Sequence, residues 1–393
     1  MRKFLVIIAD GMSGWPLKEY NCQTSLELAT TPNMDYLAKH GRLGLAKNVP
    51  DTLPAGSDVA NLSIFGYDPE KYYTGRAPIE AISQNIKLEP SDTVFRANLI
   101  QIEHNRMKDF TAGHIDSMVA KEIMDLLNKK LQKKYPDIKF YNGVSYRNLL
   151  LIKNNKFKLK TTPPHDITGQ DINNYLPDGD NSELVRNIML DCEKILKEFY
   201  LPENKNCKAN MVWLWGEGKK MQLPSFKTRY GLTGAVISAV DLIKGIGFAV
   251  GLDYVQVPGI TGFIDTNFRG KATYALKALE SHDIVFIHIE AADEAGHMGD
   301  LPLKIKAIEK IDKEVLGTIL KQNDQKDLAI LLLPDHNTPI EIKTHGRDAV
   351  PFLIYNTMRK VKTSTKRFTE KEALKSGWTV NKGCDLLDIF LKD

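Results

Sequence analysis

Four short, uninterrupted apolar runs constrain most strongly how this chain of 393 residues can fold. They are FLVII (4–8), DIVFIHI (283–289), LAILLL (328–333) and PFLIY (351–355). Continuous rather than alternating hydrophobicity is typical of strands in a parallel sheet that is covered on both faces. Between these runs lie three amphipathic stretches, at 31–41, 273–282 and 301–322. Strands that alternate with helices predict an α/β doubly wound core.

The middle of the chain has a different texture. It combines long helical stretches such as 117–135, short alternating strands such as 146–154, and a loop rich in Pro, Asp and Asn at 161–182. This mixture is typical of an α+β domain. We therefore predict a discontinuous core, formed by residues 1–87 and 225–393, with an inserted domain at 88–224.

The composition excludes several classes of protein. At 42% hydrophobic and 26% charged residues, with a net charge of only +4, the chain resembles an ordinary globular protein and carries no strong field for nucleic acid or an anionic membrane. No transmembrane segment is found, and the first apolar run is too short for a signal peptide. The four cysteines form no CxxC pair. We expect a cytoplasmic protein with reduced thiols.

Acidic and imidazole side chains follow three of the four apolar runs. In chain order they are Asp10, Asp293, His297, Asp335, His336 and His345. Ligands of open α/β sheets bind beyond the carboxyl ends of the strands, so we expect these side chains at one edge of the sheet. Three aspartates and three histidines suit two divalent cations such as Mn²⁺ or Zn²⁺, whereas sites made only of oxygen ligands suit Mg²⁺ or Ca²⁺.

Ser57 lies after a Pro-Ala-Gly turn, at the start of an apolar-periodic stretch. A serine at such a position is much more often a helix N-cap than a nucleophile. Its hydroxyl would also lie at a helix N-terminus, where amide donors favour an anion. A nearby divalent cation would lower the pKa of the hydroxyl and make it a nucleophile.

Motifs along essentially the whole chain resemble the alkaline phosphatase superfamily, and within it the archaeal-type cofactor-independent phosphoglycerate mutases. They include ADGM, TPNMDYLAKHGRLG, LPAGSDVANLSIFGYDP, YYTGRAPIEA, HIEAADEAGHMGD and PDHNTP with THGRDAVPF. The resemblance implies an alkaline phosphatase-like core with an inserted second domain. It also implies two divalent metal ions, Mn²⁺ first with Zn²⁺ or Mg²⁺ as alternatives, and no 2,3-bisphosphoglycerate.

The same resemblance implies roles for individual residues. Asp10, Ser57, Asp335 and His336 would bind one metal ion, and Asp293, His297 and His345 the other. Ser57 would become a phosphoserine during interconversion of 3-phosphoglycerate and 2-phosphoglycerate.

An inserted domain that closes over the centre would keep water from the phosphoserine. That domain would also bring cations for the carboxylate and phosphate of the substrate, and Arg147, His165 and Lys219 are the candidates.

Two alternatives stay open on the sequence. A homoserine kinase-like phosphotransferase, or a metal-dependent phosphomonoesterase, would use the same centre for a different reaction. A binding protein with an inactive metal site is the alternative from another class, although a chain without catalytic function has no chemical reason to keep the full ligand set. The sequence does not indicate an oligomeric state.

Overall fold

The chain forms two compact units. The computed structural model describes residues 2–199, 207–325, 327–361, 363, 365 and 367–393. The first unit comprises Met1–Tyr73 and Gln222–Asp393, and the second comprises Thr74–Met221. The second unit therefore begins earlier than residue 88, where the sequence predicted its start. The reason is that α5 (Arg76–Ser83) packs its apolar face on the sheet of this unit.

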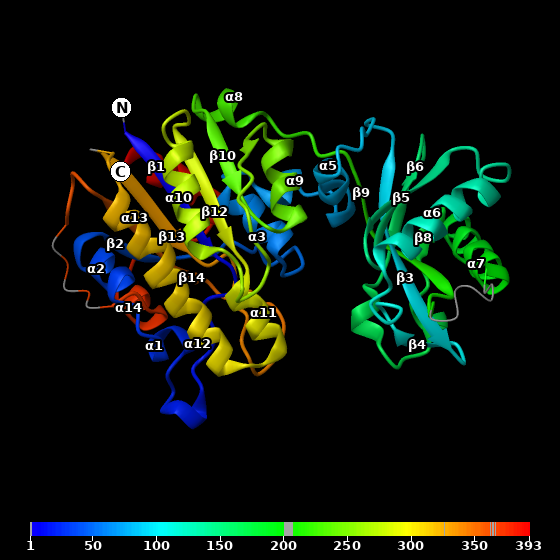
Figure 1. Ribbon diagram of the computed structural model, residues 1–393, viewed down its shortest axis with the longest axis horizontal. Helices are drawn as coiled ribbons and strands as arrows, with labels where there is room; N and C mark the ends of the chain where they lie inside the picture. The colour runs from blue at the N-terminus through cyan, green and yellow to red at the C-terminus, as the bar shows by residue number, and fades with distance from the viewer. Residues whose placement is uncertain (1, 200–206, 326, 362, 364, 366) are drawn as a thin grey trace. The chain divides into compact units, whose positions relative to one another are not determined.

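An eight-stranded sheet forms the centre of the first unit, with the order β11-β10-β12-β1-β13-β14-β2-β15 (Figure 1). The strands are β1 (Lys3–Ala9), β2 (Arg42–Ala46), β10 (Gly234–Ile237), β11 (Asp253–Tyr254), β12 (Ile284–Ile289), β13 (Leu328–Leu333), β14 (Val350–Asn356) and β15 (Thr379–Val380). All four apolar runs are strands of this sheet, which confirms the α/β class.

One strand departs from the predicted parallel arrangement. β14 runs antiparallel to both β13 and β2, whereas the pairs on either side of β1 are parallel. A parallel return requires a long crossover, usually a helix. Residues 334–349, all of which are described, form turns and isolated bridges instead. The apolar run of β14 indicated burial correctly, but it carried no information about direction.

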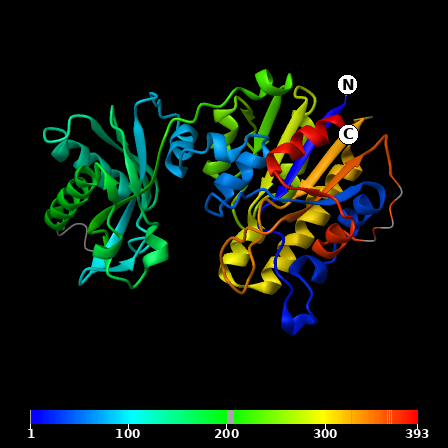
Figure 2. The same ribbon diagram turned by 180° about the vertical axis from the view of Figure 1, so that it is seen from behind.

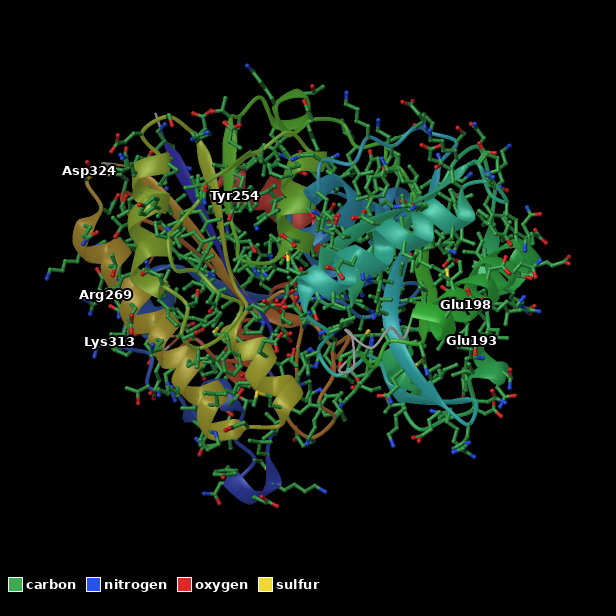
Figure 3. The ribbon with its side chains drawn as sticks, turned by 45° about the vertical axis from the view of Figure 1, so that its right-hand side comes forward. Glu193, Glu198, Tyr254, Arg269, Lys313 and Asp324 are labelled. Atoms are coloured by element: carbon green, nitrogen blue, oxygen red, sulfur yellow. The ribbon has the colours of Figure 1, made fainter. Side chains whose placement is uncertain are left out.

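Helices cover both faces of this sheet. One face carries α2 (Pro32–His40), α10 (Phe268–Ala278), α12 (Leu301–Lys310), a π-helical segment (Ile311–Leu316) and α13 (Gly317–Gln322) (Figure 1). The other face carries α3 (Ser57–Ile64), α9 (Asp241–Ala249) and α15 (Leu386–Lys392) (Figure 2). There the ring of Phe390 packs on Phe4, and Phe65 stacks on Phe286. Arg269 of α10 and Lys313 of the π-helical segment are exposed on the outer side of these helices (Figure 3).

The predicted helices of the core agree with the structure except at their ends. The stretch 301–322 is one continuous helical run that includes the π-helical segment. The helix predicted at 273–282 begins earlier, at Phe268, because Asn267 caps it there with a side chain that accepts from the amide of Gly270. Among the described residues, none of the helices has both the length and the apolar character that crossing a membrane requires.

A second sheet organises the second unit. Its strands are β3 (Thr93–Glu103), β4 (Arg106–Asp109), β5 (Ile138–Val144), β6 (Arg147–Ile152) and β9 (Met211–Lys219). One face packs on α6 (Ser117–Leu131) and α7 (Ser182–Phe199), and the other face packs on α5. Alternation along β3 explains this division, because Phe95 and Ala97 point to the helical pair while Val94 points to α5. Glu193 and Glu198 lie on the outer side of α7 (Figure 3).

The remaining elements are short. They are α1 (Ser25–Leu28), α4 (Pro69–Tyr72), α8 (Phe226–Tyr230), α11 (Ala291–Met298), α14 (Glu370–Lys375), β7 (Lys158–Lys160) and β8 (Asp178–Asp180).

Candidate metal centre

Three neighbouring parallel strands bring the predicted ligands to one edge of the first unit's sheet. Asp10 directly follows β1, α11 with Asp293 follows β12, and Asp335 follows β13. The strands lie in the order β12-β1-β13, so their carboxyl ends converge. We call the residues gathered here the strand-end cluster: Asp10, Ser57, Asp293, His297, Asp335, His336 and His345.

Asp293, His297 and His345 form one compact group. Asp293 and His297 are one helical turn apart on α11, and Nε2 of His297 lies 3.1 Å from Oδ2 of Asp293. Nε2 of His345 lies 3.8 Å from Oδ1 of Asp293 and 3.0 Å from Nε2 of His297. Because Nδ1 of His297 donates to the carbonyl of Lys343 at 3.0 Å, the Nε2 atom is the one turned toward the group.

His336 is the centre of the other group. Its Nε2 atom lies 3.3 Å from Oδ2 of Asp335, 3.6 Å from Oδ1 of Asp10 and 3.0 Å from Oγ of Ser57. Asp10, Asp335 and His336 are all buried. Asp10 and Asp293 also fall within one set of potential ligand atoms that includes His336, so the two groups adjoin.

Ser57 is the first residue of α3, and Gly56 occupies the N-cap position. The commoner role for a serine at this point, an N-cap, is therefore wrong. Instead, its hydroxyl is the one that meets Nε2 of His336. Asn61, one turn further along α3, donates to the Ser57 carbonyl and to Oδ2 of Asp335, each at 2.8 Å, and so ties the helix start to the ligands.

Two further residues of the site were missed by sequence reasoning. Nε2 of His288 lies 3.0 Å from Oδ2 of Asp10, and His288 is fully buried in β12. The hydroxyl of Thr338 donates a hydrogen bond to Oδ1 of Asp293. Oγ1 of Thr338 also lies 3.2 Å from Nδ1 of His336. Thr338 thus touches one residue of each group. A histidine inside an otherwise apolar run was the available signal for His288, whereas the PDHNTP segment gave none that distinguished Thr338.

Gly11 is required by the crowding of the cluster. Its φ is +60°, and a Cβ atom there would lie 2.5 Å from Oδ1 of Asp293 and 2.6 Å from Oγ1 of Thr338. Its amide donates to Oδ1 of Asp335 at 3.2 Å. Only glycine combines this backbone conformation with so close an approach.

The electrostatics of the cluster fit a bound cation. Burial, together with the negative charges of Asp335 and Asp293, holds the pKa of Asp10 well above its usual range. Burial alone would lower the pKa of His297, but Asp293 raises it to about 9. Among the described residues, Oδ1 of Asp10 is buried without a hydrogen-bond partner. A carboxylate oxygen left unpaired beside other carboxylates is what a divalent cation would satisfy.

Two buried lysines lie behind the ligand-bearing segments. Lys304 of α12 donates from Nζ to the carbonyls of Ser13 at 3.0 Å and Thr338 at 2.6 Å. It therefore joins the segment after β1 to the segment after β13. Lys271 of α10 donates to the carbonyl of His288 at 2.8 Å. Burial lowers the pKa of each lysine to about 8, although neighbouring carboxylates oppose the shift.

The three predicted substrate-binding residues all lie in the second unit. Arg147 is exposed at the start of β6, and Lys219 ends β9. His165 is in a short 3₁₀ turn, with its ring 5.6 Å from that of Trp215. Lys219 pairs with Thr93 on β3, whereas Arg147 pairs with Asn98. Lys219 and Arg147 therefore lie beside different parts of β3.

The fold and the strand-end cluster together define an α/β protein with potential metal ligands at the carboxyl ends of its sheet strands. Comparison with known proteins narrows the class. A sequence-family model described as 2,3-bisphosphoglycerate-independent phosphoglycerate mutase matches residues 38–200. A protein of that name from Methanosarcina barkeri is 46% identical over 99% of both chains. The chain therefore belongs to the 2,3-bisphosphoglycerate-independent phosphoglycerate mutase family. Phosphoglycerate mutases are isomerases.

Solved structures share the fold of this chain. The structure of a Pyrococcus horikoshii protein is similar with a TM-score of 0.83 at 31% identity, covering 100% of this chain and 97% of the other. A cofactor-independent phosphoglycerate mutase from Thermoplasma acidophilum has the same fold, with a TM-score of 0.65 at 24% identity and coverage of 100% and 99%.

The buried lysines make stability depend on pH in a predictable direction. The folded-state pKa of Lys304, about 8, is below its usual 10.5, so the unfolded state binds more protons between these values and stability rises with pH there. We expect Lys304→Met to reduce that slope by up to about 1 kcal/mol per pH unit. Urea unfolding in the presence of EDTA at several pH values between 8 and 10.5 measures how the free energy of unfolding changes with pH. Lys306→Met, exposed on the same helix, is the control, and an unchanged slope in Lys304→Met contradicts the prediction.

Proposed function

We propose that this chain interconverts 3-phosphoglycerate and 2-phosphoglycerate through a phosphoserine at Ser57, without 2,3-bisphosphoglycerate. The observation that carries the proposal is the 3.0 Å approach of the Ser57 hydroxyl to His336, at the edge of a cluster of buried carboxylates. Family membership supports the substrate, because relatives that match over the whole chain are named for this reaction.

In this proposal the strand-end cluster holds two divalent cations, with Mn²⁺ as the first candidate. Asp10, Ser57, Asp335 and His336 bind one of them. When bound, such cations lower the pKa of a coordinated hydroxyl and neutralise phosphoryl charge. The partner-free oxygen of Asp10 supports a ligand role for this residue.

The other cation is assigned to Asp293, His297 and His345. The Lys343 carbonyl that fixes the His297 ring supports this assignment, because it leaves Nε2 directed at the group.

The protein groups act on both halves of the reaction. The Ser57 hydroxyl loses its proton as Oγ attacks phosphorus, the bond between phosphorus and one glycerate oxygen breaks, and that oxygen takes up a proton to become a hydroxyl. The bound glycerate reorients, and its other hydroxyl takes the phosphoryl group back. The start of α3 directs amide donors to the same point, which favours the phosphoryl oxygens. Asn61 holds the Ser57 carbonyl, so the nucleophile keeps its position through both steps.

The second unit binds the substrate in this proposal. Arg147, His165 and Lys219 supply cationic groups for the carboxylate and phosphate, and their separation over the sheet supports contacts with different parts of a ligand. The protein acts in the cytoplasm on a small phosphorylated substrate, with neither nucleic acid nor a membrane as partner.

Removing the nucleophile tests the proposal. We expect Ser57→Ala to reduce turnover by at least about a thousandfold, since the Ser57 hydroxyl is the nucleophile in the proposed reaction. The measurement is formation of 2-phosphoglycerate from 3-phosphoglycerate in a coupled assay with Mn²⁺ and no added bisphosphoglycerate. Ser91→Ala, which removes an exposed hydroxyl from the second unit, is the matched control and keeps wild-type turnover. Mutase activity that survives in Ser57→Ala, or homoserine-dependent use of ATP by the wild type in place of mutase activity, would refute the proposal.

Removing one imidazole tests the metal assignment. We expect His345→Ala to lower bound Mn²⁺ from two ions to one per chain, because its group would keep only two side-chain ligands. Elemental analysis after dialysis against Mn²⁺ and gel filtration measures the ratio. His104→Ala, an exposed histidine of the second unit, should keep both ions. Two ions retained in His345→Ala would remove this residue from the ligand set.

A further inference from the structure

A buried arginine in the second unit has an unused hydrogen-bonding fork. Arg96, in the middle of β3, is only 5% exposed. Its Nε atom donates to Oε2 of Glu80 at 3.0 Å. Its two terminal Nη groups donate to no acceptor among the described residues. These Nη atoms are not fully shielded from solvent, and a guanidinium offers its strongest bidentate contacts through them.

The Arg96 guanidinium is held in one orientation. Its Cζ atom lies 4.4 Å from the centre of the Trp215 ring, so the group stacks on an aromatic surface. Glu80 of α5 fixes Nε from the adjoining layer. Gly216, at a φ of +60°, brings β9 close enough that a Cβ there would lie 3.6 Å from Cδ of Arg96. The fork is therefore preorganised before any ligand arrives.

Two further guanidinium groups, those of Arg76 and Arg147, lie close to this fork. Arg76 donates from Nε to Oε1 of Glu80 at 3.2 Å, and Arg147 acts electrostatically on the same carboxylate. Burial lowers the pKa of Arg96 to about 10, and repulsion from Arg76 and Arg147 contributes, while Glu80 opposes the shift. All three guanidinium groups therefore lie close enough to act on the Glu80 carboxylate. An added anion that contacts the Arg96 fork would gain from their positive charge.

The other acidic side chain nearby is already engaged. Glu217, on β9 next to Gly216, accepts a hydrogen bond from Thr161 at 2.6 Å, and burial raises its pKa. The cluster also opens outward, because Arg96 is buried, Arg76 is half-buried and Arg147 is exposed. A ligand from solvent can therefore reach it.

The geometry points to an oxyanion-binding site formed by Arg76, Arg96 and Arg147, which we call the guanidinium site. It takes a carboxylate or a phosphate group, because the planar fork matches two oxygens of either. The identity of the ligand rests on the proposed function, under which the oxyanion is the carboxylate or the phosphate of phosphoglycerate. Arg76 and Arg96 then join Arg147 as substrate-binding residues.

Calorimetric titration of the full chain after metal removal with EDTA tests the site apart from catalysis. The probes are 3-phosphoglycerate, D-glycerate and inorganic phosphate. We expect Arg96→Met to weaken 3-phosphoglycerate binding by at least about tenfold, and Arg96→Lys, which keeps the charge but not the fork, to recover part of it. Arg106→Met, an exposed arginine of β4, should leave affinity within about twofold. Loss of glycerate binding identifies the carboxylate as the ligand, and loss of phosphate binding identifies the phosphate.

Replacing the buried Arg96 could disturb folding, so a second variant changes the exposed Arg147. We expect Arg147→Met to weaken the binding of 3-phosphoglycerate by about three- to tenfold. Wild-type affinity in both Arg96→Met and Arg147→Met would overturn the site, as would a wild type that binds none of the probes. Arginine-dependent binding without mutase turnover would refute the proposed function and leave the site standing. Mutase turnover with an unchanged KM in Arg96→Met would leave the proposed function standing and refute the guanidinium site.

Discussion

The first unit is organised around three carboxylates that the fold buries side by side. Asp10, Asp293 and Asp335 come from different chain segments, and the parallel order of β12, β1 and β13 brings them to one edge of the sheet. Buried charges of one sign are costly unless cations or donors compensate them. Burial and the charges of Asp335 and Asp293 raise the pKa of Asp10, whereas pairing with Asp293 raises the pKa of His297 to about 9. Divalent cations bound in the cluster would offset the cost of burying these carboxylates together.

The surrounding fold supplies the rest of the compensation. Lys304 and Lys271 place buried ammonium groups behind the ligand-bearing segments, and Gly11 permits those segments to approach. Thr338 links the two groups of ligands through one hydroxyl. The second unit differs, since it gathers the guanidinium groups of Arg76 and Arg96 around the carboxylate of Glu80. Buried carboxylates in one unit and guanidinium groups in the other are what the proposed metal-dependent reaction of an anionic substrate would require.

Much of this could be predicted from the sequence because the signals were local. Asp10 directly follows one apolar run and Asp335 lies two residues after another, so predicting the buried strands also placed these candidate ligands. The direction of β14 was not predictable, because it depends on the geometry of the preceding connection. The start of the second unit was placed too late, because the membership of α5 depends on which sheet it packs against. His288 and Arg96 were missed since a polar residue inside a strand acquires meaning only from partners that folding brings near.

The most direct test of the central claim is a crystal structure of the Mn²⁺-soaked protein with anomalous scattering measured at the manganese edge. The account predicts two anomalous peaks in the strand-end cluster, with Oγ of Ser57 within about 2.5 Å of one of them. Peaks elsewhere in the chain, or a Ser57 hydroxyl with no metal ion beside it, would contradict the account.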